Sequence, residues 1–326
     1  MIERDVFHIR LKNMELQAER IMDPVLKTRP VAIISSHHPG GTVVSLSPEA
    51  EDEGLFPGMK VSVVRKISHG DQLLPYNRSL YARINQYVYQ TVSMFTPVVE
   101  PQGVGEFFLD MNGMRAIRGH VQNTGLSIIQ RIQEQTSIMG RVGISVNKLV
   151  SRIITSVVPE TIHEVKSGAE AQFLAPLQPL VLPTVQERPV HRLLRFLWIK
   201  QVNHIQSMAG RPDEFRTFFG IYALQLAREV QGKDSSVVKP PQFEDHILEQ
   251  TVLPEDTNDE PVLHAVVKDL AEQVAFKLRK RRETADRVKL EIHYTDGHQR
   301  YRMGKITGID DAVSYTHLTL PTSDLV

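Results

Sequence analysis

Gly105-Glu106-Phe107-Phe108-Leu109-Asp110-Met111 is a short, mostly apolar run that begins with a glycine, and such a run is typical of a buried β-strand. A second strand is predicted over 141–146, where the sequence is RVGISV. Apolar residues recur at helical spacing over 79–95, 119–136 and 149–157, so a helix is expected in each of these segments. Strands and helices alternate in this part of the chain, which predicts an α/β arrangement.

Two further strands are predicted closer to the N-terminus. The β-branched runs over 30–36 and 42–47 are separated by Pro39-Gly40-Gly41, which is typical of a turn. A short helix is expected over 48–53, because Pro48 lies in its first turn and acidic residues follow where the helix dipole favours them.

The second half of the chain has a different pattern. Short helical segments broken by proline and glycine predict a small helical domain over 169–232. The polar segment 233–243 contains Pro240-Pro241 and predicts an exposed, fairly stiff linker. Beyond it, a strand-like run over 246–253, a long amphipathic helix over 261–282 and an alternating strand over 287–294 predict a β-α-β domain.

The composition limits the class of protein. The chain has 326 residues, enough for two or three domains, and 38 Lys and Arg residues balance 38 Asp and Glu residues. A uniformly basic nucleic-acid coat is therefore excluded, and the lack of cysteine excludes a disulfide scaffold. The sequence contains no membrane-spanning run, and its charged N-terminus is unlike a signal peptide, so a cytoplasmic location is expected.

The end of the chain has an unusual sequence. The run from Val313 to Thr322 (VSYTHLTLPT) resembles the in-frame translation of a sequencing adaptor. We therefore expect 313–326 to be an artefactual tail and leave it out of the fold prediction.

One segment near the C-terminus is strongly basic although the whole chain is neutral. Its ten cations outnumber the four acidic residues among them, which are Glu283, Asp286, Glu291 and Asp296. Arrayed on one face of a sheet and at the end of a helix, such cations can follow a phosphate backbone. Cations that only stabilise the end of a helix are the alternative, and the pattern alone leaves both open. The ten cations are Lys277, Arg279, Lys280, Arg281, Arg282, Arg287, Lys289, Arg300, Arg302 and Lys305.

Glu106 and Asp110 are candidate metal ligands. Four residues apart on a strand, they share one face, and paired carboxylates can bind Mg²⁺. Phosphoryl-transfer sites generally need a further carboxylate at the same point, and no strand near the N-terminus supplies an obvious one. The histidines lack metal-binding spacing, and the sequence contains no phosphate-binding loop or nucleophile motif. These residues by themselves predict neither a metal site nor a self-contained enzyme.

The order of the segments resembles the Y-family (UmuC/DinB-type) translesion DNA polymerases over nearly the whole chain, up to about Asp311. No single motif is decisive, but their order and spacing together point to this family. The stretches that carry the resemblance are Glu19 with Asp23–Leu26, Pro30–Ala32, Glu49-Ala50 through Gly54 to Pro57-Gly58-Met59, Tyr81, Pro97 with Glu100, Gly105–Asp110, Val142–Leu149, Phe219-Gly220 and Val230–Asp234.

The resemblance implies a multidomain fold of mixed α+β and α/β type, with a right-hand polymerase architecture of palm, fingers, helical thumb and β-α-β little finger. The implied bounds are 1–10 and 78–165 for the palm, 11–77 for the fingers, 166–235 for the thumb, 236–243 for a linker and 244–312 for a truncated little finger.

The chain departs from the family at the metal site. Members of the family hold two Mg²⁺ ions with an aspartate of the first palm strand, in a pattern like Asp-Met-Asp, and with an Asp-Glu pair on a later strand. In this sequence Arg10 and Lys12 stand at the first-strand positions, and the pair is Gly105-Glu106. The resemblance therefore implies that one of three metal carboxylates remains and that no metal is bound.

The positions that would contact the triphosphate also differ. The family's Tyr-Glu-Ala-Arg pattern is Pro48-Glu49-Ala50-Glu51 here, so the tyrosine and the arginine are lost at Pro48 and Glu51. The Lys-Pro-x-Gly segment is Val158-Pro159-Glu160-Thr161, where Pro159 remains but the lysine before it does not. Three contacts to an incoming nucleotide are thus expected to be lost.

The thumb departs as well. The family's Gly-x-Gly turn, which approaches a DNA phosphate, corresponds to Leu182–Gln186, a segment without glycine. Leu197-Trp198-Ile199 still resembles the Leu-Gly-Ile that follows in the family. A weaker grip of the thumb on DNA is expected.

An intact framework with lost chemistry resembles the ImuB-type proteins, inactive relatives that act as scaffolds. The resemblance implies a nucleoid-associated adaptor without cofactor that binds damaged or primer-template DNA, a sliding clamp and a partner polymerase, and is not bound to a membrane. One alternative is an active translesion polymerase whose Mg²⁺ is bound by Glu106 and Asp110 with help from Asp5 or Glu15. Another is a domain that binds only protein.

Overall fold

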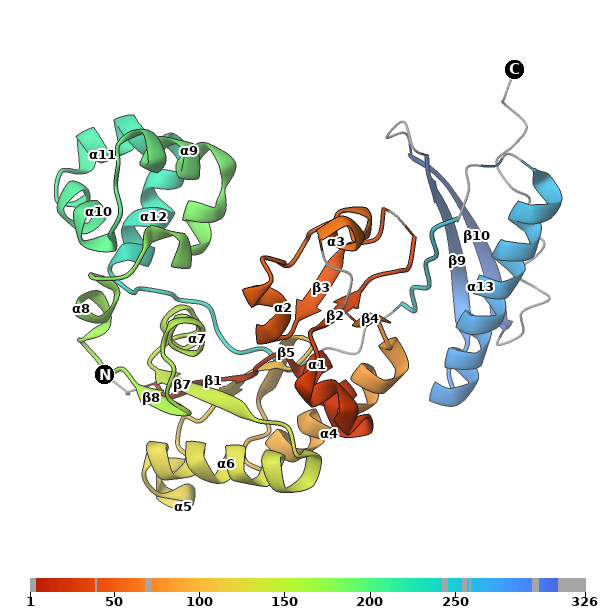
Figure 1. Cartoon of the computed structure of the whole chain (residues 1–326), viewed down its shortest axis with the longest axis horizontal. Helices are drawn as coiled ribbons and strands as arrows, with labels where there is room; N and C mark the ends of the chain where they lie inside the picture. Colours follow the sequence, from red (N-terminus) through yellow and green to blue (C-terminus); the bar gives the residue numbers. More distant parts are fainter. Residues whose placement is uncertain are drawn as a thin grey trace. The chain divides into compact units, whose positions relative to one another are not determined.

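The structure is a computed structural model that describes residues 4–38, 40–67, 72–241, 246–253, 257, 259–294 and 299–309. The chain divides into two compact units, Met1–Pro241 and Gln242–Val326, which are described separately (Figure 1). The predicted tail, 313–326, lies outside the described residues.

The first unit is organised around a five-stranded sheet in the order β5-β6-β1-β7-β8. Its central strand, β1, is antiparallel to β6 on one side and to β7 on the other, so both edges of its backbone are hydrogen-bonded. The bounds are β1 Val6–Leu11, β5 Val99–Gly103, β6 Glu106–Asp110, β7 Gly140–Ser145 and β8 Ile162–Glu164. Strands β6 and β7 confirm the predictions for 105–111 and 141–146.

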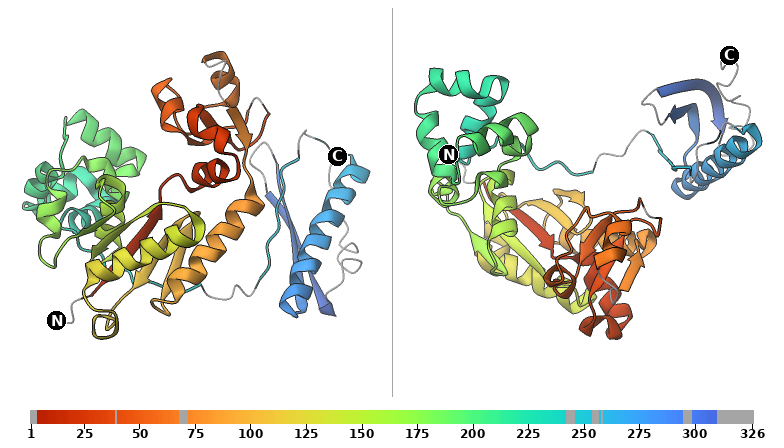
Figure 2. Two further views of the ribbon diagram at one scale, coloured as in Figure 1. Left: turned by 60° about the horizontal axis from the view of Figure 1, so that its bottom comes forward. Right: turned by 45° about the horizontal axis from the view of Figure 1, so that its top comes forward.

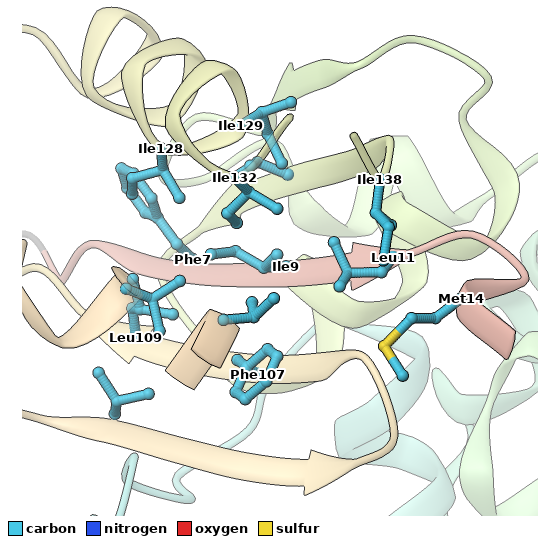
Figure 3. Close-up of a cluster of buried hydrophobic side chains, with 14 of the residues drawn as sticks. Phe7, Ile9, Leu11, Met14, Phe107, Leu109, Ile128, Ile129, Ile132 and Ile138 are labelled. Carbon is cyan, nitrogen blue, oxygen red and sulfur yellow. The ribbon is translucent and has the colours of Figure 1, made fainter. Parts of the chain in front are cut away.

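The two faces of this sheet have different coverings. Phe7, Ile9 and Leu11 alternate along β1 toward one face, where α4 (Arg78–Ser93) and α6 (Val121–Thr136) pack side by side (Figures 1 and 2). Side chains of α6 meet those of β1 and β6 in this core, which contains Ile128, Ile129, Ile132, Phe107 and Leu109 (Figure 3). Helix α7 (Lys148–Val157) packs against β1 and β7, and its Thr155 bonds the His8 side chain, which points away from this core.

A smaller sheet follows α1 in the chain. Its order is β3-β2-β4, and helices α2 and α3 contribute to a separate core with Ala32, Ile34 and Leu46. Strands β2 and β3 and helix α2 confirm the predictions for 30–36, 42–47 and 48–53. The bounds are β2 Val31–Ile34, β3 Val43–Leu46, β4 Gln72–Pro75, α2 Pro48–Asp52 and α3 Val61–Ile67.

Helix α1 (Met14–Met22) joins the two sheets through polar contacts. The buried Tyr81 of α4 donates a hydrogen bond to Glu19 (2.8 Å), and Arg20 forms an ion pair with Glu49 of α2 (2.7 Å). A short 3-10 helix, Pro24–Thr28, follows α1, and α5 (Arg115–Arg118) precedes α6.

The segment predicted as a small helical domain is helical and has its own hydrophobic core. Within it, the buried Glu229 carboxylate accepts hydrogen bonds from the backbone N–H and hydroxyl of Thr184, at 3.0 and 2.8 Å. The α-helices are α8 Glu170–Leu174, α9 Arg188–Phe196, α10 Val202–Ala209, α11 Pro212–Phe219 and α12 Ala223–Val230, and the 3-10 helices are Pro179–Val181, Pro183–Gln186 and Gly220–Tyr222.

The predicted linker 233–243 is more firmly attached than its polar composition indicated. Asp234 accepts a hydrogen bond from the backbone N–H of Leu149 (3.1 Å), and Glu100 accepts one from that of Lys239 (2.7 Å). Val238 is 6% exposed and packs with Val6 and Phe108 of the large sheet. Most of the described part of this segment is exposed, as predicted, but Val238 is not, and this apolar side chain and two hydrogen bonds fix the chain on the sheet.

The second unit contains a long helix and a hairpin. Helix α13 (Glu260–Arg281) is followed by the antiparallel strands β9 (Ala285–His293) and β10 (Gln299–Ile309), in agreement with the helix and strand predicted for 261–282 and 287–294. The strand predicted over 246–253 does not form: these residues pair with no described strand, and the side chain of Val252 is 92% exposed. Without a neighbouring strand, its apolar pattern has no sheet to join.

No described helix combines the length and the apolar composition needed to cross a bilayer.

Replacing Gly143 tests the close approach of β7 and α7. A Cβ at this position would collide with the Ser151 carbonyl oxygen and lie 2.9 Å from Ile154 Cβ. We expect Gly143→Ala to destabilise the first unit by about 1–3 kcal/mol, measured as a lower midpoint of thermal unfolding. Gly103→Ala is the matched control, because a Cβ there meets nothing within 4 Å. Equal midpoints for the two variants would contradict the packing described for β7.

Candidate functional site

Arg10 lies at the position where the family resemblance would place a metal-binding aspartate. In the register of the sheet Arg10 lies opposite Glu106 of β6 and opposite Arg141 of β7, so all three side chains lie on one face. Arg10 Nε is 3.1 Å from Glu106 Oε1, and Arg10 Nη1 donates a hydrogen bond to Ser156 Oγ (3.0 Å). The one remaining carboxylate is thus neutralised by a fixed cation.

His8 lies next to this ion pair and is fully buried. Its Nδ1 is 2.7 Å from Thr155 Oγ1, whereas its Nε2 lies 4.0 Å from Glu106 Oε2 and has no hydrogen-bond partner among the described residues. Burial, together with the smaller effects of the charges of Arg10, Arg152 and Lys148, lowers the pKa of His8 to about 3. The surroundings of Glu106 therefore oppose the arrival of another cation.

Glu106 and Asp110 do not converge. Asp110 lies opposite Val6, at the other end of the β1–β6 ladder from the Arg10–Glu106 pair. Four residues along a strand span about 13 Å, whereas oxygens that share one ion lie within a few ångströms of each other. Asp110 instead accepts a hydrogen bond from the backbone N–H of Asn112 (3.0 Å). The two candidate carboxylates thus share a face, as expected, but lie at opposite ends of the strand, too far apart to bind one ion together.

Asp5 and Glu15, the two carboxylates that could replace a lost metal ligand, are not available at the site. Asp5 is buried and forms a bidentate ion pair with Arg115, with both contacts at 2.6 Å. Glu15 lies in the first turn of α1, beyond the end of β1, and burial raises its pKa. In the described part of the chain no three His, Asp or Glu side chains cluster as metal ligands would.

Gly105 differs from an aspartate in its backbone as well as in its side chain. Its φ is +74°, in the region that favours glycine, and its N–H donates a hydrogen bond to Asn85 Oδ1 (2.8 Å). A Cβ would lie 3.2 Å from Leu11 Cβ and 3.3 Å from Met14 Cβ. With a cation at position 10 and this backbone at position 105, the residues present do not fit the Mg²⁺ pair of the family. Lys12, the second cation, is exposed just beyond the end of β1.

Three positions correspond to residues that contact the triphosphate in the family. Two of them lie beside the small sheet and one beside the large sheet. Pro48 and Glu51 belong to α2, next to the small sheet, and Ser47 caps this helix by accepting a hydrogen bond from Ala50. Glu51 is exposed, so a carboxylate stands where the family has an arginine. Pro159 follows α7, next to the large sheet, and is preceded by Val158, whose carbonyl accepts a hydrogen bond from Arg141 (3.2 Å).

The ten cations of the second unit do not share one face. Arg287 and Lys289 of β9 lie on one face of the hairpin, where Lys305 is opposite Arg287. Arg300 and Arg302 are opposite Ile292 and Leu290, and so belong to the other face. The remaining five, Lys277, Arg279, Lys280, Arg281 and Arg282, end α13 or follow it directly. The predicted array is therefore split in three.

Ion pairs reduce the charge of this segment. Lys277 pairs with Glu249, Arg281 with Glu283 (3.9 Å) and Lys289 with Glu291 (2.6 Å). On the face of Arg287, Lys289 and Lys305, below called the outer hairpin face, Lys289 Nζ also lies 5.0 Å from the centre of the Tyr301 ring. Tyr301 is 67% exposed, so the outer hairpin face combines cations with an accessible aromatic ring.

His8, Arg115 and Arg141 were not singled out from the sequence. Thr155, which contacts His8, and Asp5, which contacts Arg115, are more than a hundred residues away in the chain, and Arg141 lies opposite Arg10 on a neighbouring strand. No local spacing signals these contacts, which depend on the tertiary fold.

The buried, uncharged state of His8 has a measurable consequence. Because its pKa falls from 6.5 to about 3 on folding, only the unfolded chain binds a proton at this residue between these two values. Its contribution to stability is therefore complete above pH 6.5 and is lost as the pH falls toward 3. Ring chemical shifts in NMR spectra should show a neutral His8 throughout this window, and His8→Gln should flatten the pH dependence of urea unfolding. Protonation of the folded ring near pH 6.5 would contradict the described burial.

Comparison with known proteins gives a consistent result. Two family models match this chain: the impB/mucB/samB family over residues 9–156 and the C-terminal domain of the same family over 245–324, a range that includes most of the 313–326 segment. DNA polymerase IV of Dehalococcoides mccartyi (strain ATCC BAA-2266 / KCTC 15142 / 195) is 30% identical over 298 residues, covering 91% of this chain and 75% of that protein. DNA polymerase IV 1 of Bacillus subtilis (strain 168) is 23% identical, covering 90% and 71%.

Solved structures show the same fold. A Y-family DNA polymerase chimera of Dbh and Dpo4 superposes with a TM-score of 0.72 at 19% identity and covers 96% of this chain and 91% of that one. DinB of Sulfolobus solfataricus superposes with a TM-score of 0.66 at 20% identity, with the same coverage. The multidomain architecture expected from the resemblance is thereby confirmed. The chain belongs to the impB/mucB/samB family and is a Y-family DNA polymerase-like protein.

Proposed function

We propose that this chain is a catalytically inactive Y-family protein that binds DNA and acts as an adaptor in a translesion complex. The observation that carries the proposal is the ion pair between Arg10 and Glu106. It replaces a metal-binding carboxylate with a cation and occupies the one carboxylate that remains.

The physical argument concerns the charge of the reaction. In-line phosphoryl transfer places negative charge on the attacking oxygen, the leaving oxygen and the transferred phosphoryl group, and divalent ions held by carboxylates compensate it. Here Arg10 pairs with Glu106, Arg141 lies opposite Arg10 on the next strand, and the adjacent His8 imidazole is neutral. Such a site repels a divalent cation, and a fixed guanidinium cannot activate a primer hydroxyl as a bound metal does.

DNA is the proposed nucleic-acid partner. The relatives reported above are named DNA polymerases, and the second unit, which matches the family's C-terminal domain, carries the outer hairpin face and the cations that end α13. We assign 1–10 and 78–165 to the palm, 11–77 to the fingers, 166–235 to the thumb, 236–243 to the linker and 244–312 to the little finger.

The adaptor role is supported by what the chain retains. Residues that carry the family resemblance form buried framework contacts: Tyr81 bonds Glu19, Lys148 bonds Glu100 (2.6 and 2.8 Å), and Asn147 bonds the Gly232 carbonyl (2.7 Å). A chain that keeps its shape but not its chemistry fits a scaffold that presents DNA to other proteins. The proposed protein partners are a sliding clamp and a partner polymerase.

Primer extension tests the loss of catalysis. We expect no nucleotide addition with Mg²⁺ or Mn²⁺, because the site cannot hold the metal pair, while a gel shift on the same sample shows bound template-primer. The Dehalococcoides mccartyi relative serves as the positive control. Extension that survives repurification and is abolished by Glu106→Ala would establish the alternative, an active polymerase with a rebuilt site.

Charge reversal tests the DNA contact of the second unit. We expect Arg287→Glu, Lys289→Glu and Lys305→Glu together, or Arg279→Glu, Lys280→Glu, Arg281→Glu and Arg282→Glu together, to weaken DNA binding. Each lost phosphate contact should flatten the slope of log K against log[salt] by about 0.9. Lys268→Glu, an exposed cation nearer the middle of α13, is the control. Unchanged slopes in both sets would place the DNA contact elsewhere, and the domain that binds only protein would then be the better description.

A further inference from the structure

Helix α9 presents a row of arginines that lies outside the Arg10–Glu106 site and the cations of the second unit. Arg188, Arg192 and Arg195 are spaced four and three residues apart, which places them on one face of the helix. All three are exposed, and none forms an ion pair with a residue that the structure describes. The helix therefore carries an uncompensated positive stripe.

A hollow adjoins this stripe. It is lined by Arg188, Pro189, Arg192, Leu193 and Phe196 and has a volume of about 570 Å³. Phe196 is 79% exposed, and Leu193 is half-buried. Apolar surface thus lies directly beside the guanidinium groups, an arrangement that favours a ligand with both apolar and negatively charged groups.

Trp198, directly after this helix, has a backbone conformation that normally belongs to glycine. The helix ends in a Schellman motif: Ile199 N–H bonds the Leu194 carbonyl (3.0 Å) and Trp198 N–H bonds that of Arg195 (3.2 Å). Trp198 occupies the position of this motif that requires a positive φ, and its φ is +53°. Glycine adopts this conformation freely, whereas a bulky side chain there costs free energy.

Packing does not explain the tryptophan. The ring of Trp198, the chain's single tryptophan, is 77% exposed, and Lys200 Nζ lies 5.6 Å from the ring centre. A strained and exposed aromatic side chain is a feature from which a function can be inferred. Tryptophan, phenylalanine and arginine are also the residues enriched at the centres of protein interfaces.

From these observations we infer that α9 and Trp198 form a docking surface for an acidic, amphipathic segment of a partner protein. Carboxylates of the segment pair with Arg188, Arg192 and Arg195, and its apolar side chains enter the hollow beside Phe196. The backbone of a DNA duplex fits less well, because its phosphates and sugars have no apolar group for the hollow, and the single-stranded case, in which bases can stack on an aromatic ring, is an outcome of the test below. The surface is distinct from the Arg10–Glu106 site, so the inference does not depend on the loss of catalysis.

The probe is a fluorescein-labelled helical peptide of about 20 residues, with leucine and phenylalanine on one face and glutamate flanking them. Fluorescence anisotropy with the full chain measures its binding, and the emission of Trp198 reports contact with the ring. We expect a peptide with lysine in place of glutamate to bind at least about tenfold more weakly. Arg192→Glu with Arg195→Glu should weaken binding of the acidic peptide by a similar factor.

Trp198→Gly separates binding from folding. Because glycine relieves the backbone strain, we expect this variant to unfold at the same temperature as the wild type or higher, yet to bind the acidic peptide at least several-fold more weakly. Arg216→Glu and Phe218→Ala are the controls, since both residues are exposed on α11 of the same helical domain and lie outside the surface.

Three results would overturn the inference. The first is equal affinity for the acidic and the lysine peptide, and the second is equal binding of the acidic peptide by the Trp198→Gly and Phe218→Ala variants. The third is a single-stranded oligothymidylate that binds more tightly than the acidic peptide and whose binding is weakened by Arg192→Glu with Arg195→Glu. The last result would make this a nucleic-acid surface. Primer extension is measured in a separate experiment, so failure of the peptide to bind does not affect the test of catalysis.

Discussion

Strand β1 is hydrogen-bonded along both edges, and this double pairing determines what the rest of the first unit can do. Because side chains alternate along a strand, placing Phe7 and Ile9 in the core under α6 sends His8 and Arg10 to the opposite face. The register with β6 then fixes Arg10 opposite Glu106. The charge at one position of β1 thus sets the electrostatics of the whole site, and a shift of one residue would bury Arg10 in the apolar core.

The residues that carry the family resemblance and the positions that depart from it have different structural roles. Hydrogen bonds between helices and strands are formed by Glu19 with Tyr81 and by Glu100 with Lys148. Burial alone would raise the pKa of Glu100, but the hydrogen bonds from Lys148 and from the Lys239 backbone keep this pKa below its ordinary value. The positions with altered chemistry contribute little to this framework: Glu51 is exposed, and Pro48 only begins a short helix. Shape is therefore maintained by one set of contacts while the chemistry of the other set has changed.

The sequence predicted the parts of the fold that have a strong local pattern. Strands β2, β3, β6 and β7 and helices α4, α6, α7 and α13 were found from periodicity and turn residues, whereas β5 was missed because Pro101 and Gly103 break its apolar pattern. The substitutions at Arg10 and Gly105 were recognised through the family resemblance. Their contacts were not, because an ion pair between strands and a positive φ depend on register and backbone geometry, which one sequence does not contain.

The conformation of Gly105 also determines what a second metal-binding carboxylate at this site would require. An aspartate at this position would have to adopt a φ of +74°, and its Cβ would crowd Leu11 and Met14. Arg10 would still be paired with Glu106 in the register of the two strands. An aspartate restored at position 10 alone would face Glu106 without a third ligand. Each single step back thus brings a cost without a gain, and only a combined change would be rewarded. If the proposed loss of catalysis holds, rebuilding the metal site therefore requires several simultaneous substitutions, and no series of single ones leads to it.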